Sequence, residues 1–341
     1  MKTARYWKPL EDGAVRCDLC PHRCRIPPEG RGRCRGRVNR GGTLVAATWG
    51  RPVAVQVDPI EKKPLHHFLP GTDVLSLGTL GCNLACRFCQ NWSLSHPAEG
   101  AFEAAEGAEV VPEEIARLAA ERGIPAVAAT YNEPAVWAEY ALDIAEACHA
   151  NGLRMVAVTS GYFTPESRLD FFRKMDAANV DLKSFRDEFY REWCGARLAP
   201  VLETLAAIRA ETDCWLEVTT LLIPGLNDSE AEIDELTAWV AEHLGEDTPL
   251  HFSAFHPDGE MRDRPPTPPA TLRRAREQAK ENGLRHVYVG NVRGEEDATA
   301  TFCPDCGARL IDREGFRSRR VKMDPDGRCQ VCGKICAGVW T

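Results

Sequence analysis

Long apolar runs are missing from this 341-residue sequence. No stretch is long enough to span a bilayer, and the opening M-K-T-A-R-Y-W-K lacks the apolar core of a secretory signal. Basic residues are also outnumbered, because 42 lysines and arginines stand against 50 aspartates and glutamates, which gives a net charge of -8. That balance argues against a broad surface for nucleic acid or anionic lipid. We therefore expect a cytoplasmic protein that binds neither a membrane nor nucleic acid.

Cysteine, in contrast, is abundant and unevenly distributed. Fifteen cysteines are many for a reducing compartment, where clustered thiols bind metal more often than they form disulfides. Cys148 and Cys214 stand in apolar surroundings and are expected to be small core residues. Cys194 also lies outside the groups. The other twelve form three compact groups: Cys17, Cys20, Cys24 and Cys34; Cys82, Cys86 and Cys89; and Cys303, Cys306, Cys329, Cys332 and Cys336.

The middle group has the sequence C-N-L-A-C-R-F-C. A cubane [4Fe-4S] cluster has four irons, and each normally takes one cysteine thiolate. Three closely spaced thiolates leave one iron open, and an open metal position is typical of a catalytic site. A zinc site would need a fourth ligand close by, and the following Q-N-W-S-L-S supplies none before His96. We therefore predict a [4Fe-4S] cluster at Cys82, Cys86 and Cys89.

The first group reads C-D-L-C-P-H-R-C, with Cys34 following after nine intervening residues. Its surroundings are rich in Gly, Pro and Arg, so the segment cannot build a core of its own and a metal is expected to hold it. Four thiolates form a closed site, which favours a structural role. Zinc is the first choice, a second iron-sulfur cluster is the alternative, and His22 could replace one of the cysteines.

The last group consists of two knuckles, C-P-D-C-G and C-Q-V-C-G, separated by 22 residues. Paired knuckles of this kind resemble a zinc-ribbon or rubredoxin-like module, in which four cysteines surround one metal ion. Zinc is favoured over iron. Cys336 is a fifth thiol and an alternate ligand. Because so short a tail buries little apolar surface, we expect the metal to supply most of its stability.

An alternation of strands and helices fills the middle of the chain. Apolar strands alternating with helices favour a parallel sheet covered by helices, and at least six repeats predict an α/β fold, a partial (βα)6-type TIM barrel, with small Cys-rich metal-binding modules at both ends. A doubly wound Rossmann sheet is the alternative, but no G-x-G-x-x-G follows the first strand. We expect strands at 74–81, 125–131, 154–160, 179–184, 214–223, 250–256 and 286–290. We expect helices at 111–123, 134–151, 165–174 and 270–282, helical segments between 184 and about 211, and a further helix that begins at about 229.

This pattern divides the chain into three parts. Residues 1–73 form a Cys-rich module with lead-in strands, residues 74–298 form the barrel, and residues 299–341 form the C-terminal metal module. Within the first part, 43–57 is predicted to hold two short strands around a turn. The polar stretch D-P-I-E-K-K-P-L-H-H-F-L-P-G at 58–71 is either an ordinary loop or a functional element beside the cluster.

Several motifs together resemble known families. The cluster loop, T-Y-N-E-P, D-L-K and L-L-I-P-G-L-N-D resemble the radical S-adenosylmethionine (radical SAM) superfamily, and within it the enzymes that activate glycyl radical enzymes such as pyruvate formate-lyase. The N-terminal C-x-L-C-P-H-x-C, the D-P-I-E-K-K-P-L-x-H-F segment and the two C-terminal knuckles resemble the radical SAM member of the AmmeMemoRadiSam system. The resemblance implies that SAM binds the open iron and is cleaved by one electron to a 5′-deoxyadenosyl radical.

The resemblance also implies roles for single residues. Glu133 and Asn132 stand where the family's Gly-Gly-Glu motif meets the amino group of SAM, although Tyr131 and Asn132 replace the glycines and make side-chain contact more plausible there. Lys183 in D-L-K can meet the SAM carboxylate. The remaining implied SAM contacts are Phe88 at the adenine, Ser160 at the ribose, Asp181 beside Lys183, and His256 near the adenosyl group.

The resemblance leaves the reaction open. Residues 90–125 contain no cysteine, whereas many activating enzymes carry an extra cluster insert after the radical SAM loop. The substrate is a protein in one hypothesis, as for a glycyl radical activase, and a small metabolite in a second. In a third, the chain is a non-catalytic iron-sulfur or zinc scaffold or electron carrier. A reductant such as flavodoxin or ferredoxin is expected, and Memo-like and AMMECR-like proteins are candidate partners.

Overall fold

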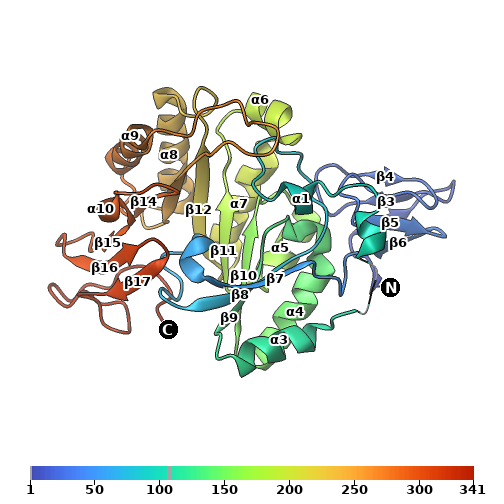
Figure 1. Ribbon diagram of the computed structural model, residues 1–341, viewed down its shortest axis with the longest axis horizontal. Helices are drawn as coiled ribbons and strands as arrows, with labels where there is room; N and C mark the ends of the chain where they lie inside the picture. The colour runs from blue at the N-terminus through green and yellow to red at the C-terminus, as the bar shows by residue number, and fades with distance from the viewer. Residues whose placement is uncertain (1, 106, 108) are drawn as a thin grey trace.

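A single large sheet organises the computed structural model, which describes residues 2–105, 107 and 109–341 (Figure 1). Within these residues the sheet has eight strands in the order β14-β13-β12-β11-β10-β9-β8-β7. Strands β8 to β14 are parallel, and β7 pairs antiparallel with β8. Their bounds are β7 Ala54–Pro59, β8 Asp73–Gly78, β9 Ala126–Ala129, β10 Arg154–Thr159, β11 Ala177–Asp181, β12 Trp215–Leu222, β13 Leu250–Ala254 and β14 Val287–Gly290.

Helices follow the parallel strands along the chain and pack on the outer face of the sheet (Figure 1). Pro112 begins α3, and Pro165 and Pro269 begin α5 and α9, positions where the missing N–H costs nothing. The helical bounds are α1 Trp92–Ser95, α2 Ala101–Ala104, α3 Pro112–Glu121, η2 Pro134–Trp137, α4 Ala138–Ala150, α5 Pro165–Phe172, α6 Asp187–Phe189, η3 Tyr190–Cys194, α7 Ala199–Glu211, α8 Glu230–Leu244, α9 Pro269–Glu281 and α10 Glu296–Thr299.

The two faces of the strands bury different partners, because successive side chains of a strand point to opposite sides. On β9, Val127 and Ala129 join the large core with the helices. Ala126 and Ala128 instead join a smaller core with Ile60 and Phe68. The segment that follows β7, including the 3-10 helix η1 (Ile60–Lys62), therefore covers part of the inner face of the barrel.

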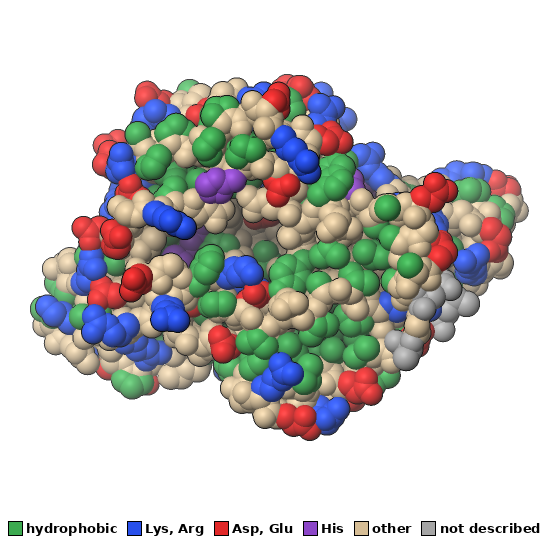
Figure 2. All heavy atoms as spheres, viewed as in Figure 1, with side chains coloured by type: hydrophobic (Ala, Val, Ile, Leu, Met, Phe, Trp, Pro, Cys, Tyr) green, Lys and Arg blue, Asp and Glu red, His purple; other side chains and the backbone are tan. Residues whose placement is uncertain are grey.

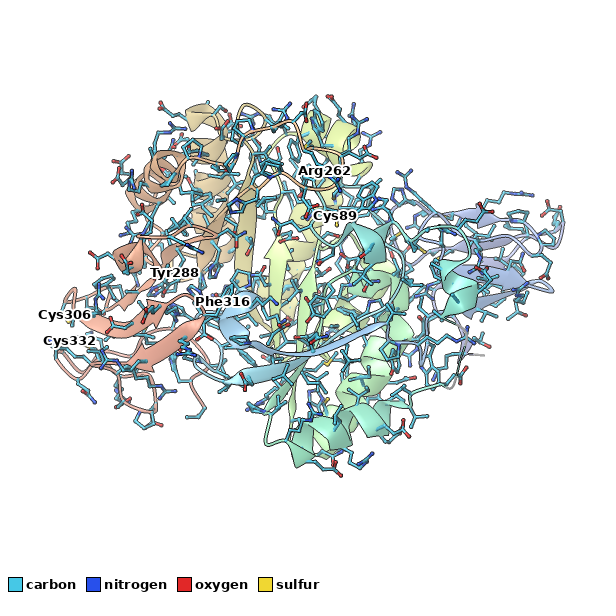
Figure 3. All side chains as sticks on the ribbon, in the orientation of Figure 1. Cys89, Arg262, Tyr288, Cys306, Phe316 and Cys332 are labelled. Carbon is cyan, nitrogen blue, oxygen red and sulfur yellow. The ribbon has the colours of Figure 1, made fainter. Side chains whose placement is uncertain are left out.

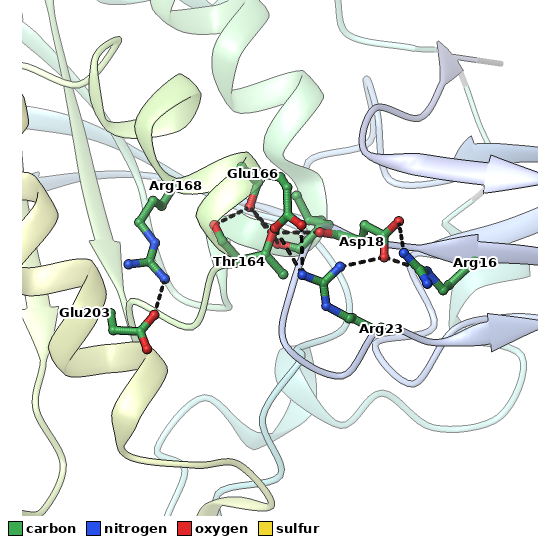
Figure 4. Close-up of polar contacts among 9 residues, drawn as sticks. Arg16, Asp18, Arg23, Thr164, Glu166, Arg168 and Glu203 are labelled. Atoms are coloured by element: carbon green, nitrogen blue, oxygen red, sulfur yellow. Dashed lines mark hydrogen bonds and ion pairs between the residues drawn. The ribbon is translucent and has the colours of Figure 1, made fainter.

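The N-terminal module carries two small sheets and is held against the outside of the barrel. The strands are β1 Lys2–Thr3, β5 Arg37–Arg40 and β6 Thr43–Ala46 in one sheet, and β2 Trp7–Pro9, β3 Val15–Cys17 and β4 Arg25–Ile26 in the other. A fully buried ion pair of 2.6 Å joins Arg37 of the module to Glu139 of α4. Arg23 bridges Asp18 and Glu166 of α5, each at 2.8 Å (Figure 4).

The C-terminal module packs on the segment that covers the inner face. Its sheet consists of β15 Thr301–Phe302, β16 Arg309–Glu314 and β17 Arg317–Arg320. Arg313 donates 2.7 Å to the carbonyl of His66. The backbone N–H of Leu69 donates 2.8 Å to the carbonyl of Val339, and the N–H of Val339 donates 2.7 Å to the carbonyl of His67. Residues 299–341 are thereby tied to the wall of the barrel interior.

The fold confirms the predicted α/β barrel architecture and adds detail. The described sheet has seven parallel strands where a (βα)6-type barrel has six, and β7 belongs to it although the sequence places that strand in the lead-in. The helix expected over 134–151 begins as the 3-10 turn η2 before α4. No helix within the described residues is long and apolar enough to cross a membrane.

Candidate active site

A cavity of about 680 Å³ lies on the inner face of the barrel, and Figure 2 shows this side of the molecule hollowed near its middle. Polar side chains collect there because the carboxyl ends of parallel strands meet at one end of a barrel. The cavity volume lies within the range of small-molecule sites. Nine of the predicted cluster and SAM residues line it: Cys82, Cys86, Phe88, Cys89, Asn132, Glu133, Ser160, Asp181 and Lys183.

The three cysteines come from the loop that follows β8. Cys86 is buried, and Cys82 and Cys89 are half-buried on the cavity wall. The Cys89 thiol lies 3.1 Å from the Ser95 hydroxyl, and the backbone N–H of Leu84 donates 3.4 Å to the sulfur of Cys82. The loop thus offers three supported thiols to one space.

The donor set fits a polynuclear cluster. Thiolates are the soft ligands that iron-sulfur clusters select. The sulfurs of Cys82, Cys86 and Cys89 do not all lie within 4.8 Å of one another. They are therefore spread more widely than the ligands of a single ion. A hydrogen bond from the Cys194 thiol lowers the pKa of Cys86, with Lys183 contributing, which favours the thiolate. Burial and the nearby Glu133 raise the pKa of Cys82, so its thiolate needs a metal to form.

Glu133 and Asn132 hold the strand ends in place. The Glu133 carboxylate accepts hydrogen bonds from Ser160 N (2.7 Å), Ser160 Oγ (2.6 Å), Thr159 Oγ1 (2.5 Å) and Ala135 N (3.1 Å). The Asn132 side-chain oxygen accepts from the backbone N–H of Thr79, and its Nδ2 donates to the Thr79 hydroxyl and, at 2.8 Å, to the carbonyl of Gly81. With Trp137 Nε1 as a second donor to Asn132 Oδ1, its hydrogen-bonding capacity is filled. Asn132 therefore positions the cysteine loop, and direct contact with SAM would require exchanging these bonds.

Lys183 supplies a positive charge beside the thiols. Its Nζ lies 2.8 Å from Asp181 and 6.0 Å from the ring centre of Phe88. Burial opposes the charge, but Asp181 and the Cys86 and Cys194 thiols raise the pKa of Lys183 well above its ordinary value. The ammonium is therefore charged at neutral pH and available to an anionic group in the cavity.

His256 lies apart from this set. Its side chain is exposed, its Nε2 donates 3.0 Å to the carbonyl of Asn291, and it does not line the cavity. Sequence reasoning missed other residues that do. Thr219 lines the wall, and His96 does so next to Ser95, with 2.9 Å between Ser95 Oγ and His96 Nδ1. Cys194, which stands alone in the sequence, is buried against the cluster loop, where its carbonyl accepts from Ala85 N at 2.8 Å.

The polar segment after β7 forms one wall of the cavity. Asp58 pairs with Lys62 at 2.8 Å and Lys63 at 2.7 Å, and it accepts 2.6 Å from the Tyr131 hydroxyl. Tyr131 adopts the left-handed backbone, φ 70°, a conformation that favours glycine. Lys62, Lys63 and His66 of this segment all line the cavity.

The deeper part of this wall is built on Glu217 of β12. Its carboxylate accepts from the backbone N–H groups of His66 (2.9 Å) and His67 (2.7 Å) and from His251 Nε2 (2.6 Å). The His66 ring packs edge-on to His251, and its Nδ1 is buried without a hydrogen-bond partner among the described residues. Burial holds the pKa of His66 well below its ordinary value, so the ring is neutral.

In the C-terminal module the four knuckle cysteines lie close together. The Cys303–Cys332 and Cys306–Cys329 sulfurs are each 3.6 Å apart, and Cys306 and Cys332 lie together at the edge of the molecule (Figure 3). These four sulfurs all lie within 4.8 Å of one another, as one ion requires. Cys336 lies instead with His67 and His286 in a buried group.

The comparisons with known proteins agree with this geometry. Residues 77–237 match the family model described as the radical SAM superfamily. The chain is 41% identical, over 98% of both chains, to the uncharacterised protein MJ0808 of Methanocaldococcus jannaschii. The chain belongs to the radical SAM superfamily. This radical SAM chain is also 29% identical over 133 residues, 38% of its length and 39% of the other's, to the benzylsuccinate synthase activating enzyme of Thauera aromatica.

A solved radical SAM structure shares the fold. Streptococcus suis SuiB, solved bound to S-adenosylmethionine, superposes with a TM-score of 0.51 at 15% identity, covering 69% of this chain and 53% of SuiB. The superfamily is one of enzymes, and it implies a [4Fe-4S] cluster and SAM as cofactors. Cys82, Cys86 and Cys89 are the residues of this radical SAM chain that fit the cluster, because they are the three thiols on the cavity wall.

Proposed function

We propose that this protein cleaves SAM reductively at a [4Fe-4S] cluster held by Cys82, Cys86 and Cys89. The observation that carries the proposal is that these thiols share one cavity with the charged Lys183 ammonium and the Glu133 carboxylate. When bound, the cluster and SAM supply a 5′-deoxyadenosyl radical that abstracts hydrogen from a substrate. Three thiolates leave one iron for a ligand other than the protein.

Residues of this chain are suited to bind and orient SAM. The Lys183 ammonium, charged and partly buried, suits the carboxylate of the SAM methionine moiety, and Asp181 keeps it in place. Glu133 and Ser160 follow the neighbouring strands β9 and β10 and form one hydrogen-bonded unit, suited to the amino and ribose groups. Phe88 offers an apolar face for the adenine. The Cys194 thiol, by donating to Cys86, tunes the electron density on a cluster ligand.

A protein substrate is one candidate. The likeness to the benzylsuccinate synthase activating enzyme supports it, since that protein's name describes activation of another enzyme. In this candidate the product is a glycyl radical or a modified side chain on a partner. The flanking metal modules would then take part in docking, and Memo-like and AMMECR-like proteins are the partners to test first. A flavodoxin or ferredoxin in the cytoplasm would deliver the electron.

A small polar metabolite is the second candidate, and the wall formed by the His66 segment and β12 favours it. His66 Nδ1 and Thr219 Oγ1 are buried there with no hydrogen-bond partner among the described residues. Unsatisfied buried polar groups are costly, so these two atoms suit a bound molecule that supplies a donor and an acceptor. Lys62 and Lys63 on the same wall suit an anionic group.

Anaerobic reconstitution followed by reduction tests the proposal. With SAM and a one-electron reductant, the protein should form 5′-deoxyadenosine, and a true substrate should raise the rate. His66→Ala should lose the stimulation by a small polar substrate but keep slow uncoupled cleavage, whereas the exposed His243→Ala should behave like wild type. A protein that holds its cluster but releases no 5′-deoxyadenosine would be an iron-sulfur scaffold or electron carrier instead.

A further inference from the structure

The four N-terminal cysteines surround a small cavity between the module and the barrel. Cys17, Cys20, Cys24 and Cys34 all line it, together with apolar side chains such as Leu19 and Ile26, and its volume is about 20 Å³. The surface exposed inside this cavity is almost wholly apolar or sulfur, although the polar side chains of His22, Arg37 and Asn83 also line it. The chain therefore brings four thiols from separate turns to one dry space.

The spacing of these thiols differs from that of a single-ion site. Four thiolates bound to one tetrahedral ion at 2.3 Å stand about 3.8 Å apart and leave no space between them. The C-terminal cysteines match that spacing, with two sulfur pairs at 3.6 Å. No three of the four N-terminal sulfurs, all from described residues, lie within 4.8 Å of one another, and a cavity separates them. The wider spacing resembles that of Cys82, Cys86 and Cys89.

We propose that Cys17, Cys20, Cys24 and Cys34 hold a second [4Fe-4S] cluster, closed by four thiolates, and not the zinc ion that the sequence favours. Four irons bridged by sulfides hold their cysteine ligands farther apart than one ion does, and a cubane takes one cysteine per iron. Because all four irons are coordinated by protein, this cluster has no position for SAM.

A buried cation beside the cavity supports an anionic occupant. Arg37 lines the cavity, and although one of its nitrogens pairs with Glu139, its Nε has no hydrogen-bond partner among the described residues. An unpaired guanidinium N–H in a dry interior is costly unless a ligand accepts from it. A cluster sulfide or thiolate is an acceptor of the required charge.

The second site adjoins the loop that carries the catalytic cysteines. Asn83 lines the N-terminal cavity, and its carbonyl accepts 2.7 Å from His22 Nε2. At Gly81, whose φ is 90°, an added Cβ would lie 2.1 Å from the carbonyl oxygen of Cys34. The chain thus runs from one proposed cluster site to the other through residues 81–83, and the contact tolerates only glycine at position 81.

Metal and sulfide analysis of the full chain tests this inference. The variant Cys82→Ala/Cys86→Ala/Cys89→Ala, reconstituted anaerobically, should keep about four irons and four acid-labile sulfides per chain, against about eight of each in wild type. Adding Cys20→Ala/Cys24→Ala to that variant should remove this iron and sulfide. Labile sulfide separates a cluster from an iron ion in the C-terminal module, because a rubredoxin-like site contains none.

The contrary result is equally specific. A triple variant that is colourless and carries zinc at the N-terminal site, with no labile sulfide, would overturn the inference, and the assignment of the catalytic cluster to Cys82, Cys86 and Cys89 would be unaffected. Mössbauer spectroscopy of iron-57 wild-type protein gives a second measurement if the variants fail to fold. Two distinct [4Fe-4S] components, one of which changes on addition of SAM and one of which does not, are expected, and a single SAM-sensitive component would contradict the proposal.

Discussion

Lys183 is the residue whose surroundings most directly connect the thiols to a ligand. Its ammonium is charged because Asp181 and the neighbouring thiols outweigh the cost of burial, and it faces the cavity that the thiols line. The sequence already pointed to this residue, because its D-L-K segment resembles the one that meets the SAM carboxylate in the family. Sequence could not show that Cys194 donates to Cys86, because the two lie on separate segments and only the fold brings them together.

Replacing Lys183 should weaken SAM binding without removing iron. A hydrogen bond between charged groups contributes about 1.5–3 kcal/mol, so Lys183→Ala should raise the dissociation constant of SAM by roughly ten- to a hundredfold. Equilibrium dialysis on the reconstituted protein gives the constant, and iron analysis gives the cluster content. The exposed Lys174→Ala is the matched control. Loss of iron with unchanged SAM affinity would mean that Lys183 is structural.

Asp58 makes a prediction about acid stability. Burial opposes its ionisation, but hydrogen bonds from Lys62, Lys63 and Tyr131 hold the pKa of Asp58 well below its ordinary value. Asp58→Asn leaves the buried Lys63 ammonium unpaired, and breaking such a pair costs about 3–5 kcal/mol, so the Tm should fall clearly at pH 7.

The pH dependence of that difference follows from the sign of the shift. A carboxyl with a depressed folded-state pKa stabilises the protein above its unfolded pKa of about 3.9 and loses this contribution as pH falls through the lower folded value. The Tm gap between wild type and Asp58→Asn should thus be constant near neutrality and shrink below about pH 4. The exposed Asp73→Asn should show no gap at either pH, and a gap that widens in acid would contradict the assignment.

At the scale of elements, the stretch from η1 to Leu69 joins the barrel interior to the C-terminal module. Glu217 fixes the backbone of this stretch from β12, and Arg313 fixes it from β16. The sequence predicted the strands and helices closely, because apolar runs and Pro, Gly and Asn boundaries are local signals. It left 58–71 open between loop and functional wall, because its partners, such as Arg313, lie about 250 residues away and no local pattern records such contacts.

Removing Arg313 should loosen this connection. Its guanidinium donates to the carbonyls of His66 (2.7 Å) and Thr299 (3.0 Å) and to Thr301 Oγ1 (2.8 Å) in a buried position. Arg313→Ala leaves these acceptors unpaired, which should cost about 2–4 kcal/mol and increase hydrogen exchange at 66–69 and 299–301. The exposed Arg317→Ala serves as control. Unchanged exchange at 66–69 would mean that the contact does not hold the wall.

The metal of the C-terminal module should be required for the same contact. Cys306→Ala/Cys332→Ala should lose one metal ion per chain, which we expect to be zinc. Hydrogen exchange should then increase in residues 301–341 and at the β-bridge between Phe68 and Val339. Cys336→Ala, whose thiol lies with His67 and His286, should keep the ion. A red, reducible protein would show iron in place of zinc, and metal loss in Cys336→Ala would contradict the four-ligand assignment.

For the whole molecule, the fold places three groups of thiols around one barrel. The C-terminal site has single-ion spacing, whereas the sulfurs of the cavity loop and of the N-terminal module stand farther apart. Cysteine spacing in the sequence identified all three groups, since ligand spacing is local. It could not rank zinc against a cluster in the N-terminal group, because that choice depends on distances between sulfurs set by β3, β4 and the barrel loop.

The central claim is that Cys82, Cys86 and Cys89 hold the cluster at which SAM is cleaved. The most direct measurement is reductive formation of 5′-deoxyadenosine by three single variants, Cys82→Ala, Cys86→Ala and Cys89→Ala, beside wild type and the buried bystander Cys148→Ala. Each of the three should abolish 5′-deoxyadenosine formation while metal remains bound at both end modules, and Cys148→Ala should retain it. Undiminished 5′-deoxyadenosine in all three variants would contradict the account.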